Sequence, residues 1–148
     1  MSTRSRIGLE LASGKIKSIY CHWDGYPEGV GATLKAHYTN PEKIEELLSL
    51  GDISCLGDFY DKELAEKAWK RFDKNANLTP EEEEKISHMT QPYNDRGEET
   101  SARIDDNEFD FANKIGDCWE DYAYLYKQDY DGVYKWFCLE PSCFKVLE

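Results

Sequence analysis

The sequence lacks a long apolar run, and this absence excludes a membrane-spanning protein. No stretch approaches the ~20 consecutive apolar residues that a helix needs to cross a bilayer. The N-terminal segment Met1–Arg6 is polar and has no apolar core of the kind found in a signal peptide. We therefore expect no membrane partner and a cytoplasmic location.

Cysteines are few and follow no regular pattern. Five of them, an odd number, are scattered along the chain, at Cys21, Cys55, Cys118, Cys138 and Cys143. Such spacing is poor material for a disulfide framework, and zinc sites normally show two closely spaced ligand pairs such as CxxC. The pattern favours buried free thiols in a reducing compartment, with no metal and no cofactor.

The chain also lacks the sequence motifs of the common enzyme classes. It contains no GxSxG elbow, no P-loop, no GxGxxG and no HExxH. Cys21 and His22 are adjacent on an expected strand and point to opposite faces, so they cannot form a catalytic pair with each other. We expect no catalytic residues and a non-enzymatic protein; the alternative is a small hydrolase that uses His22 or His37 with a nearby carboxylate.

Basic residues are in deficit. The chain has 30 acidic against 18 basic residues, a net charge of −12, which repels the phosphates of nucleic acids. Direct nucleic-acid binding is therefore not expected. The same acidity allows another function, that of a nucleic-acid mimic that occupies the basic surface of an enzyme.

The remaining composition is that of a folded domain. Hydrophobic residues make up 40% of the 148 residues and aromatic residues 14%, enough to bury a core in one domain that spans residues 1–148. The runs 6–11 and 16–23 surround Ser13-Gly14 and predict a β-hairpin with a two-residue turn. In that register Ile7 lies opposite Tyr20, and Arg4 lies opposite Trp23.

Helix and strand signals follow this hairpin. We expect a short helix over 30–38 and a second one that Asn40 caps and Pro41 begins, and paired strands over 122–127 and 133–139 around Asp131-Gly132. Residues 59–100 differ in residue pattern from the segments on either side and predict a helical insertion. Thr79 is the expected helix cap, and Glu82 completes a capping box. The fold class is α+β: an antiparallel sheet built from the N- and C-terminal hairpins, with helices packed on one face and the helical insertion in the middle.

One loop within this insertion is similar to a calcium-binding EF-hand loop. Asp73, Asn75, Asn77 and Glu84 occupy its positions one, three, five and twelve. Position six should be glycine, for the sharp turn, and here it is Leu78. This departure favours a polar connection between two helices over a calcium site.

The segment Tyr20–Pro27 (YCHWDGYP) concentrates aromatic rings, an imidazole and a carboxylate at a strand end. Rings, an arginine and a few polar groups suit a planar, nucleotide-like ligand. The alternative is an aromatic plug that only closes the end of the strand. The candidate ligand-binding residues are Arg4, Arg6, His22, Trp23, Asp24 and Tyr26.

The stretch Thr3–Ile7 (TRSRI), followed by Ser18–Pro27 (SIYCHWDGYP), His37-Tyr38 and Leu50–Ser54 (LGDIS), carries a resemblance to known sequences. It resembles a family of small uncharacterised proteins of bacteriophages and bacterial mobile elements over about the first 57 residues, and residues 119–139 resemble the family's C-terminal end. Residues 59–100 match nothing in that family.

The family supplies no activity to carry over, but the resemblance implies a context. Small accessory phage proteins often act in the bacterial cytosol and counteract host defence by binding and sequestering. We therefore expect a non-enzymatic binding protein whose partner is a nucleotide-like small molecule or a host defence protein.

Overall fold

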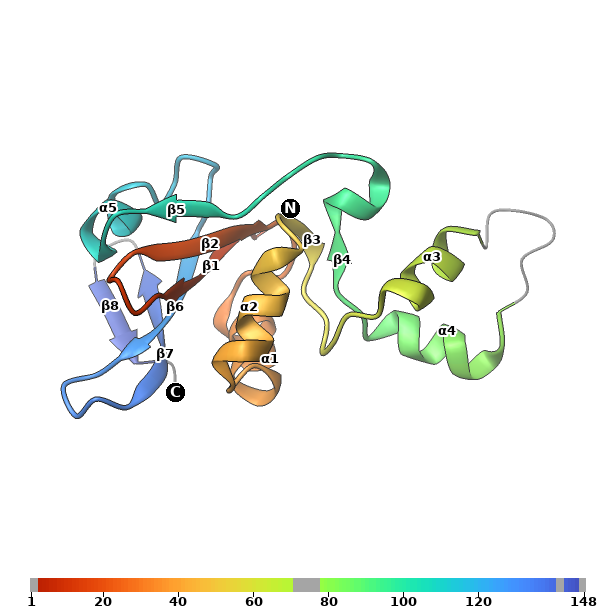
Figure 1. Cartoon of the computed structure of the whole chain (residues 1–148), viewed down its shortest axis with the longest axis horizontal. Coiled ribbons are helices and arrows are strands. Elements are labelled where there is room, and N and C mark those ends of the chain that lie inside the picture. Colours follow the sequence, from red (N-terminus) through yellow and green to blue (C-terminus); the bar gives the residue numbers. More distant parts are fainter. Residues whose placement is uncertain (1–2, 71–77, 141–142, 147–148) are drawn as a thin grey trace.

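A single mixed sheet organises the chain. The computed structural model describes residues 3–70, 78–140 and 143–146. Strands β1 (Ser5–Glu10) and β2 (Ile16–Cys21) form its central hairpin, and the order is β4-β3-β2-β1-β6-β7-β8, with β5 also paired to β2 (Figure 1). The other strands are β3 (Ile53–Cys55), β4 (Gln91–Pro92), β5 (Arg103–Asp105), β6 (Tyr122–Gln128), β7 (Tyr134–Glu140) and β8 (Cys143–Val146). The α+β fold class is confirmed.

The register of the central hairpin differs by one residue from the expected one. Ile7 pairs with Ile19, and Ser5 pairs with Cys21. The connection has three residues, not two, because the amide of Leu11 bonds to the carbonyl of Lys15 and Gly14 takes a left-handed conformation (φ 87°). The expected pairing of Arg4 with Trp23 is therefore wrong, since a slip of one residue exchanges the faces of a strand.

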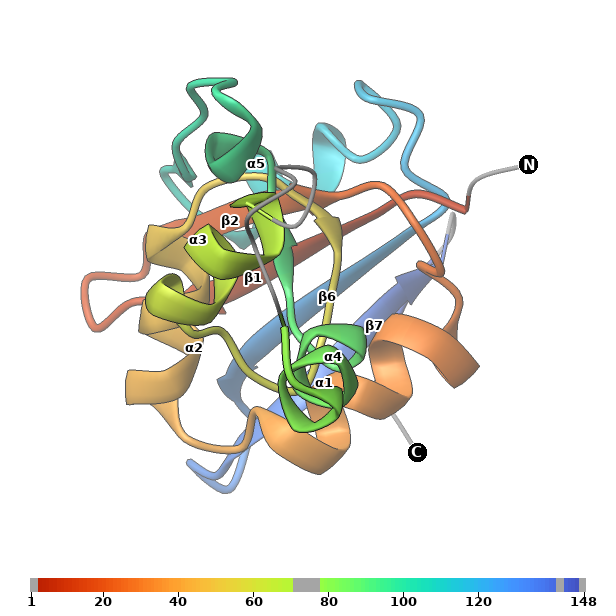
Figure 2. The ribbon, with the colours of Figure 1, turned by 90° about the vertical axis from the view of Figure 1, so that its right-hand side faces the viewer.

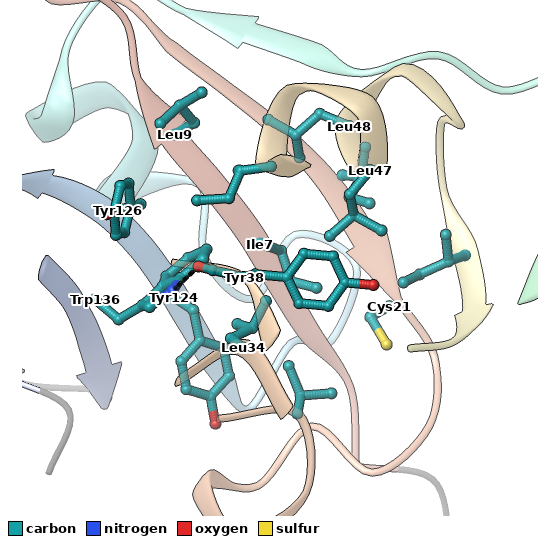
Figure 3. Close-up of a cluster of buried hydrophobic side chains, with 14 of the residues drawn as sticks. Ile7, Leu9, Cys21, Leu34, Tyr38, Leu47, Leu48, Tyr124, Tyr126 and Trp136 are labelled. Atoms are coloured by element: carbon teal, nitrogen blue, oxygen red, sulfur yellow. Dashed lines mark hydrogen bonds between the residues drawn. The ribbon is translucent and has the colours of Figure 1, made fainter. Parts of the chain in front are cut away.

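The corrected register places the main core under two helices. Ile7, Leu9, Ile19 and Cys21 pack beneath α1 (Ala32–His37) and α2 (Pro41–Ser49). Tyr38 lies at the centre of this cluster (Figure 3), where its backbone carbonyl accepts a hydrogen bond from the buried indole of Trp136 at 2.8 Å. As expected, the Asn40 side chain caps α2, accepting from the amide of Glu42.

The opposite face of the sheet has a smaller core. Helix α5 (Glu108–Asn113) inserts Phe111 against Ile16, Ala123 and Leu125. Gly8 makes room for this ring, because a Cβ there would lie 3.2 Å from Phe111. Helices were expected on one face only, and the structure has a further short helix, α5, on the opposite face, at the end of the sheet near β5 (Figure 1).

The C-terminal hairpin joins the N-terminal one as expected. Strand β6 pairs antiparallel with β7 and runs parallel to β1, so that Ser5 lies beside Tyr122. The start of β1 and the start of β6 consequently lie at the same end of the sheet. The turn between β6 and β7 lies at the other end.

Two further helices extend away from the sheet. Helices α3 (Lys62–Lys70) and α4 (Pro80–Ser87) lie side by side (Figures 1 and 2) and share a small apolar cluster around Leu64, Ile86 and Met89. Thr79 and Glu82 form the expected capping box at the start of α4. The chain then returns through β4 and the 3-10 turn η2 (Tyr93–Arg96) to the sheet edge. Asp73, Asn75 and Asn77, of the loop similar to an EF-hand, lie outside the described residues.

Candidate functional site

Aromatic rings and an arginine form a strip at the end of the sheet where β1 begins. Trp23 and Trp119 are its exposed members, and Arg4, Tyr20 and His22 are half-buried. Its members are linked by contacts: the indole of Trp23 meets the His22 ring edge-on at 4.8 Å, and the hydroxyl of Tyr20 lies 2.8 Å from Nδ1 of His22. The Arg4 guanidinium in turn lies 5.7 Å from the centre of the Trp119 ring, within cation–π range. We call these five residues, Tyr20, His22, Trp23, Arg4 and Trp119, the aromatic–arginine strip.

Arg4 and Tyr20 connect the two halves of the strip. Partial burial raises the pKa of the Tyr20 hydroxyl, and the charge and hydrogen bonding of Arg4 act in the opposite direction, so the two groups are neighbours. Arg4 thus lies between Tyr20 and Trp119, and the expected partner, Trp23, lies at the far end of the strip. The strip therefore continues from β2 across to the loop that precedes β6.

The backbone that carries Trp23 is held on several sides. The amide of Trp23 donates to the carbonyl of Ser54 at 3.0 Å. The amide of Gly25 donates to the carbonyl of Thr3, and the buried hydroxyl of Tyr124 donates to the carbonyl of Gly25 at 2.7 Å. Trp23 is 43% exposed on this backbone, so part of its indole faces solvent.

A second loop presents Trp119 on the other side of β1. The Trp119 side chain is 75% exposed and its backbone is left-handed, with φ 61°. Among the described residues only Asp24 (φ 57°) shares that conformation without being glycine. Aspartate adopts this conformation readily, whereas a bulky residue such as Trp119 does so rarely, so the backbone of the Trp119 loop is the unusual one.

Arg6 lies behind this loop instead of on the surface. It is buried, and its Nε lies 3.2 Å from the fully buried carboxylate of Glu120. Burial, followed by the charge of Arg103, lowers the pKa of the guanidinium, while Glu120 and Asp52 act to raise it. The other oxygen of Glu120 accepts from the amides of Gly116 and Cys118. The interpretation of Arg6 as a ligand-contacting residue is therefore not supported; its contacts position the Trp119 loop.

Asp24 and Tyr26 lie beside the strip, and Asp24 borders a small hollow. The Tyr26 hydroxyl donates to a carboxylate oxygen of Asp24 at 3.3 Å, and the negative charge of Asp24 raises the pKa of that phenol. The hollow next to them has a volume of about 160 Å³ and is lined by Trp23, Asp24, Glu28 and residues of α1 and β3. It is smaller than the ~300 Å³ at which ligand pockets begin, and its two carboxylates repel phosphate.

Two histidines meet one carboxylate elsewhere. His37 Nε2 lies 3.4 Å from Asp58 Oδ1, and His88 Nδ1 lies 3.8 Å from Asp58 Oδ2. The histidine–carboxylate proximity required by the hydrolase hypothesis thus exists at His37, but the distance exceeds that of a well-formed hydrogen bond. All three side chains are at least two-fifths exposed, which is typical of a surface charge cluster and not of a catalytic cleft.

Other chemistry is sparse in the part of the chain that the structure describes. There, no group of three or more histidine, cysteine or acidic side chains is arranged to hold a metal ion. None of the described helices combines the length and apolar character that crossing a membrane requires. Cys21 is a buried free thiol, and its burial raises the pKa to about 12, whereas Cys118 is exposed in the Trp119 loop.

The chain was compared with protein-family models, with curated proteins and with solved structures, and no match was found in any of the three.

Sequence reasoning found Arg4, His22, Trp23, Asp24 and Tyr26 at this end of the sheet but missed Tyr20 and Trp119 as members of the strip. The expected register places Tyr20 opposite the core residue Ile7, whereas Tyr20 pairs with Arg6. One feature of the sequence could have indicated that Trp119 is exposed. It lies among polar residues just before an aromatic strand, outside any apolar pattern that would bury it.

Proposed function

We propose that this protein is a non-enzymatic binding protein that sequesters a host protein through the aromatic–arginine strip. The supporting observation is that two exposed indoles and an arginine stand together on loops that independent hydrogen-bond networks hold in place. Tryptophan, tyrosine and arginine are the residues that carry most of the binding energy in protein–protein interfaces. The proposal includes the role implied by the resemblance to phage and mobile-element proteins, namely counteracting host defence in the bacterial cytosol.

The shape of the site favours a protein over a nucleotide-like molecule as the partner. A nucleotide needs a concave pocket with cationic groups for its phosphates. The hollow beside Trp23 has a volume of about 160 Å³ and is lined by Asp24 and Glu28. Arg4 lies against Trp119, and Arg6 lies in an internal ion pair with Glu120. A strip with two exposed indoles beside a shallow hollow suits a complementary protein surface.

The experiment is affinity capture from a bacterial host lysate with the full chain and three variants. Trp119→Ala and Trp23→Ala each remove one indole of the strip. Tyr130→Ala removes a fully exposed ring from the β6–β7 turn at the other end of the sheet and is the matched control. We expect one captured protein to be lost with both tryptophan variants and retained with Tyr130→Ala.

The affinity of the captured protein then tests the strip quantitatively. An interface tryptophan that acts as a hot spot is worth at least about 2 kcal/mol, so each tryptophan variant should weaken the dissociation constant by roughly 30-fold. Capture that is indifferent to both tryptophans would refute the proposal. Affinity that depends steeply on salt but not on the tryptophans would support the acidic-mimic alternative instead.

A further inference from the structure

A cavity of about 370 Å³ lies away from the strip, between helix α2 and the segment that leads into α3. None of its lining residues belongs to the strip, and the protein-binding role proposed above makes no use of it. Its volume falls in the range of small-molecule sites, roughly 300–1,000 Å³.

The walls of the cavity are mainly apolar. Leu47 and Leu50 line it from the α2 side, and Phe59 and the ring of Tyr60 line it from the facing segment. The hydroxyl of Tyr60 already donates to Asp95 at 3.0 Å, so the phenol contributes mainly its ring. A ligand in this space therefore needs a hydrocarbon or aromatic body.

Tyr38 forms a further part of the lining and is almost wholly buried. Its hydroxyl donates to the carbonyl of Gly57 at 2.7 Å. The ammonium of Lys43 lies 4.6 Å from the centre of its ring. The cation at this cavity is thus held in place by a buried aromatic residue.

The charged groups of the lining come from one helix. Lys43 and Glu46 are three residues apart on α2 and both line the cavity, so their side chains project from the same side of the helix. One N–H of Lys43 donates to the carbonyl of Asp58 at 3.0 Å, and an ammonium has three such donors. A cation and an anion therefore line the same apolar space.

This arrangement discriminates between classes of ligand by charge. A simple anion is attracted by Lys43 but repelled by Glu46, and a simple cation meets the reverse situation. A molecule that carries both charges at one end of an apolar body satisfies both side chains at once. We propose that the cavity binds a free α-amino acid with a hydrocarbon or aromatic side chain, its carboxylate on Lys43, its ammonium on Glu46 and its side chain against Leu47 and Phe59.

Isothermal titration calorimetry with L-phenylalanine and L-leucine, at up to about 10 mM so that millimolar binding is visible, tests the proposal. Two analogues separate the charges: 3-phenylpropionate lacks the ammonium and phenethylamine lacks the carboxylate. We expect at least one of the amino acids to bind and both analogues to bind at least tenfold more weakly than L-phenylalanine or not at all. Binding of neither amino acid, or equal binding of L-phenylalanine and both analogues, would overturn the proposal.

Variants locate the binding in the cavity. Glu46→Gln and Lys43→Gln should each weaken the binding of the amino acid at least tenfold. Glu42→Gln, an exposed glutamate of the same helix outside the lining, should leave it unchanged. Unchanged affinity in Glu46→Gln would refute the proposed contact even if Lys43→Gln fails to fold. Trp119→Ala should bind the amino acid normally, so the outcome here is independent of the strip.

Discussion

The buried ion pair between Arg6 and Glu120 gives the sharpest test of how far burial strengthens the contacts that hold the Trp119 loop. The substitution Glu120→Gln keeps the size of the side chain and an oxygen that can accept from the amides of Gly116 and Cys118. It removes the charge that faces a buried guanidinium, whose pKa is already lowered by burial and by the charge of Arg103. The variant therefore leaves a cation inside the protein without its direct partner.

The expected loss of stability is large. Breaking a buried ion pair on one side costs about 3–5 kcal/mol. The negative charge of Asp52 also acts on Arg6, so we expect a value near the lower end, about 3 kcal/mol. For urea slopes of roughly 1–3 kcal/mol/M, this loss lowers the midpoint of unfolding by roughly 1–3 M. Urea titration followed by far-UV circular dichroism measures it.

A surface pair in the same protein provides the control. Lys17 and Glu45 lie 3.3 Å apart, almost the distance of the Arg6–Glu120 pair, but their side chains are 27% and 44% exposed. Glu45→Gln should cost no more than about 1 kcal/mol, because solvent screens exposed pairs. Equal costs for Glu120→Gln and Glu45→Gln would refute the argument that burial makes the Arg6 pair important.

Three further predictions concern Gly25, Asp105 and the thiols. Gly25→Ala should destabilise the fold by about 1–3 kcal/mol in urea titration, because a Cβ there would lie 2.8 Å from the Thr3 carbonyl oxygen; a neutral effect would contradict the close approach. Burial acts to raise the pKa of Asp105, but hydrogen bonds from Lys114 and Arg103 outweigh it, so the pKa lies below its usual value. The stability that comes from this lowered pKa is present above the unfolded pKa of about 3.9 and is lost as the pH falls through the folded pKa. The native chain and Asp105→Asn should therefore differ less in their free energy of unfolding as the pH is lowered. A difference in free energy that stays constant with pH would contradict this. With Ellman's reagent, exposed Cys118 should react at once and Cys21, whose pKa is raised to about 12, only on unfolding; rapid labelling of both, located by mass spectrometry, would contradict the burial of Cys21.

The elements that depend on a few neighbouring residues could be predicted from the sequence. The Asn40 and Thr79 caps and the Asp131-Gly132 hairpin are set by a few adjacent residues, and each lies where it was expected. The register of the first hairpin was not predictable in the same way. Whether Gly14 ends a two-residue or a three-residue turn depends on one left-handed residue, and that single choice exchanges the two faces of the strand.

The site was predictable only in part, and for the same reason. Arg4 contacts a tryptophan, as expected, but that tryptophan is Trp119, more than a hundred residues away. Strand β6 brings it there by pairing in parallel with β1. Short motifs carry no information about such a pairing, since two parallel strands are joined only through the rest of the fold.

The two tryptophans of the strip are positioned by separate interactions. The Trp23 loop is anchored by Tyr124 through Gly25, and the Trp119 loop is anchored by Arg6 through Glu120. Because Tyr124 and Arg6 are buried on the central strands β6 and β1, the geometry of both loops is set by the sheet. A binding surface fixed before its partner arrives loses little conformational entropy on association, which favours affinity at a small contact area. If the strip is the binding surface proposed above, the buried side chains at this end of the sheet contribute to recognition as well as to stability.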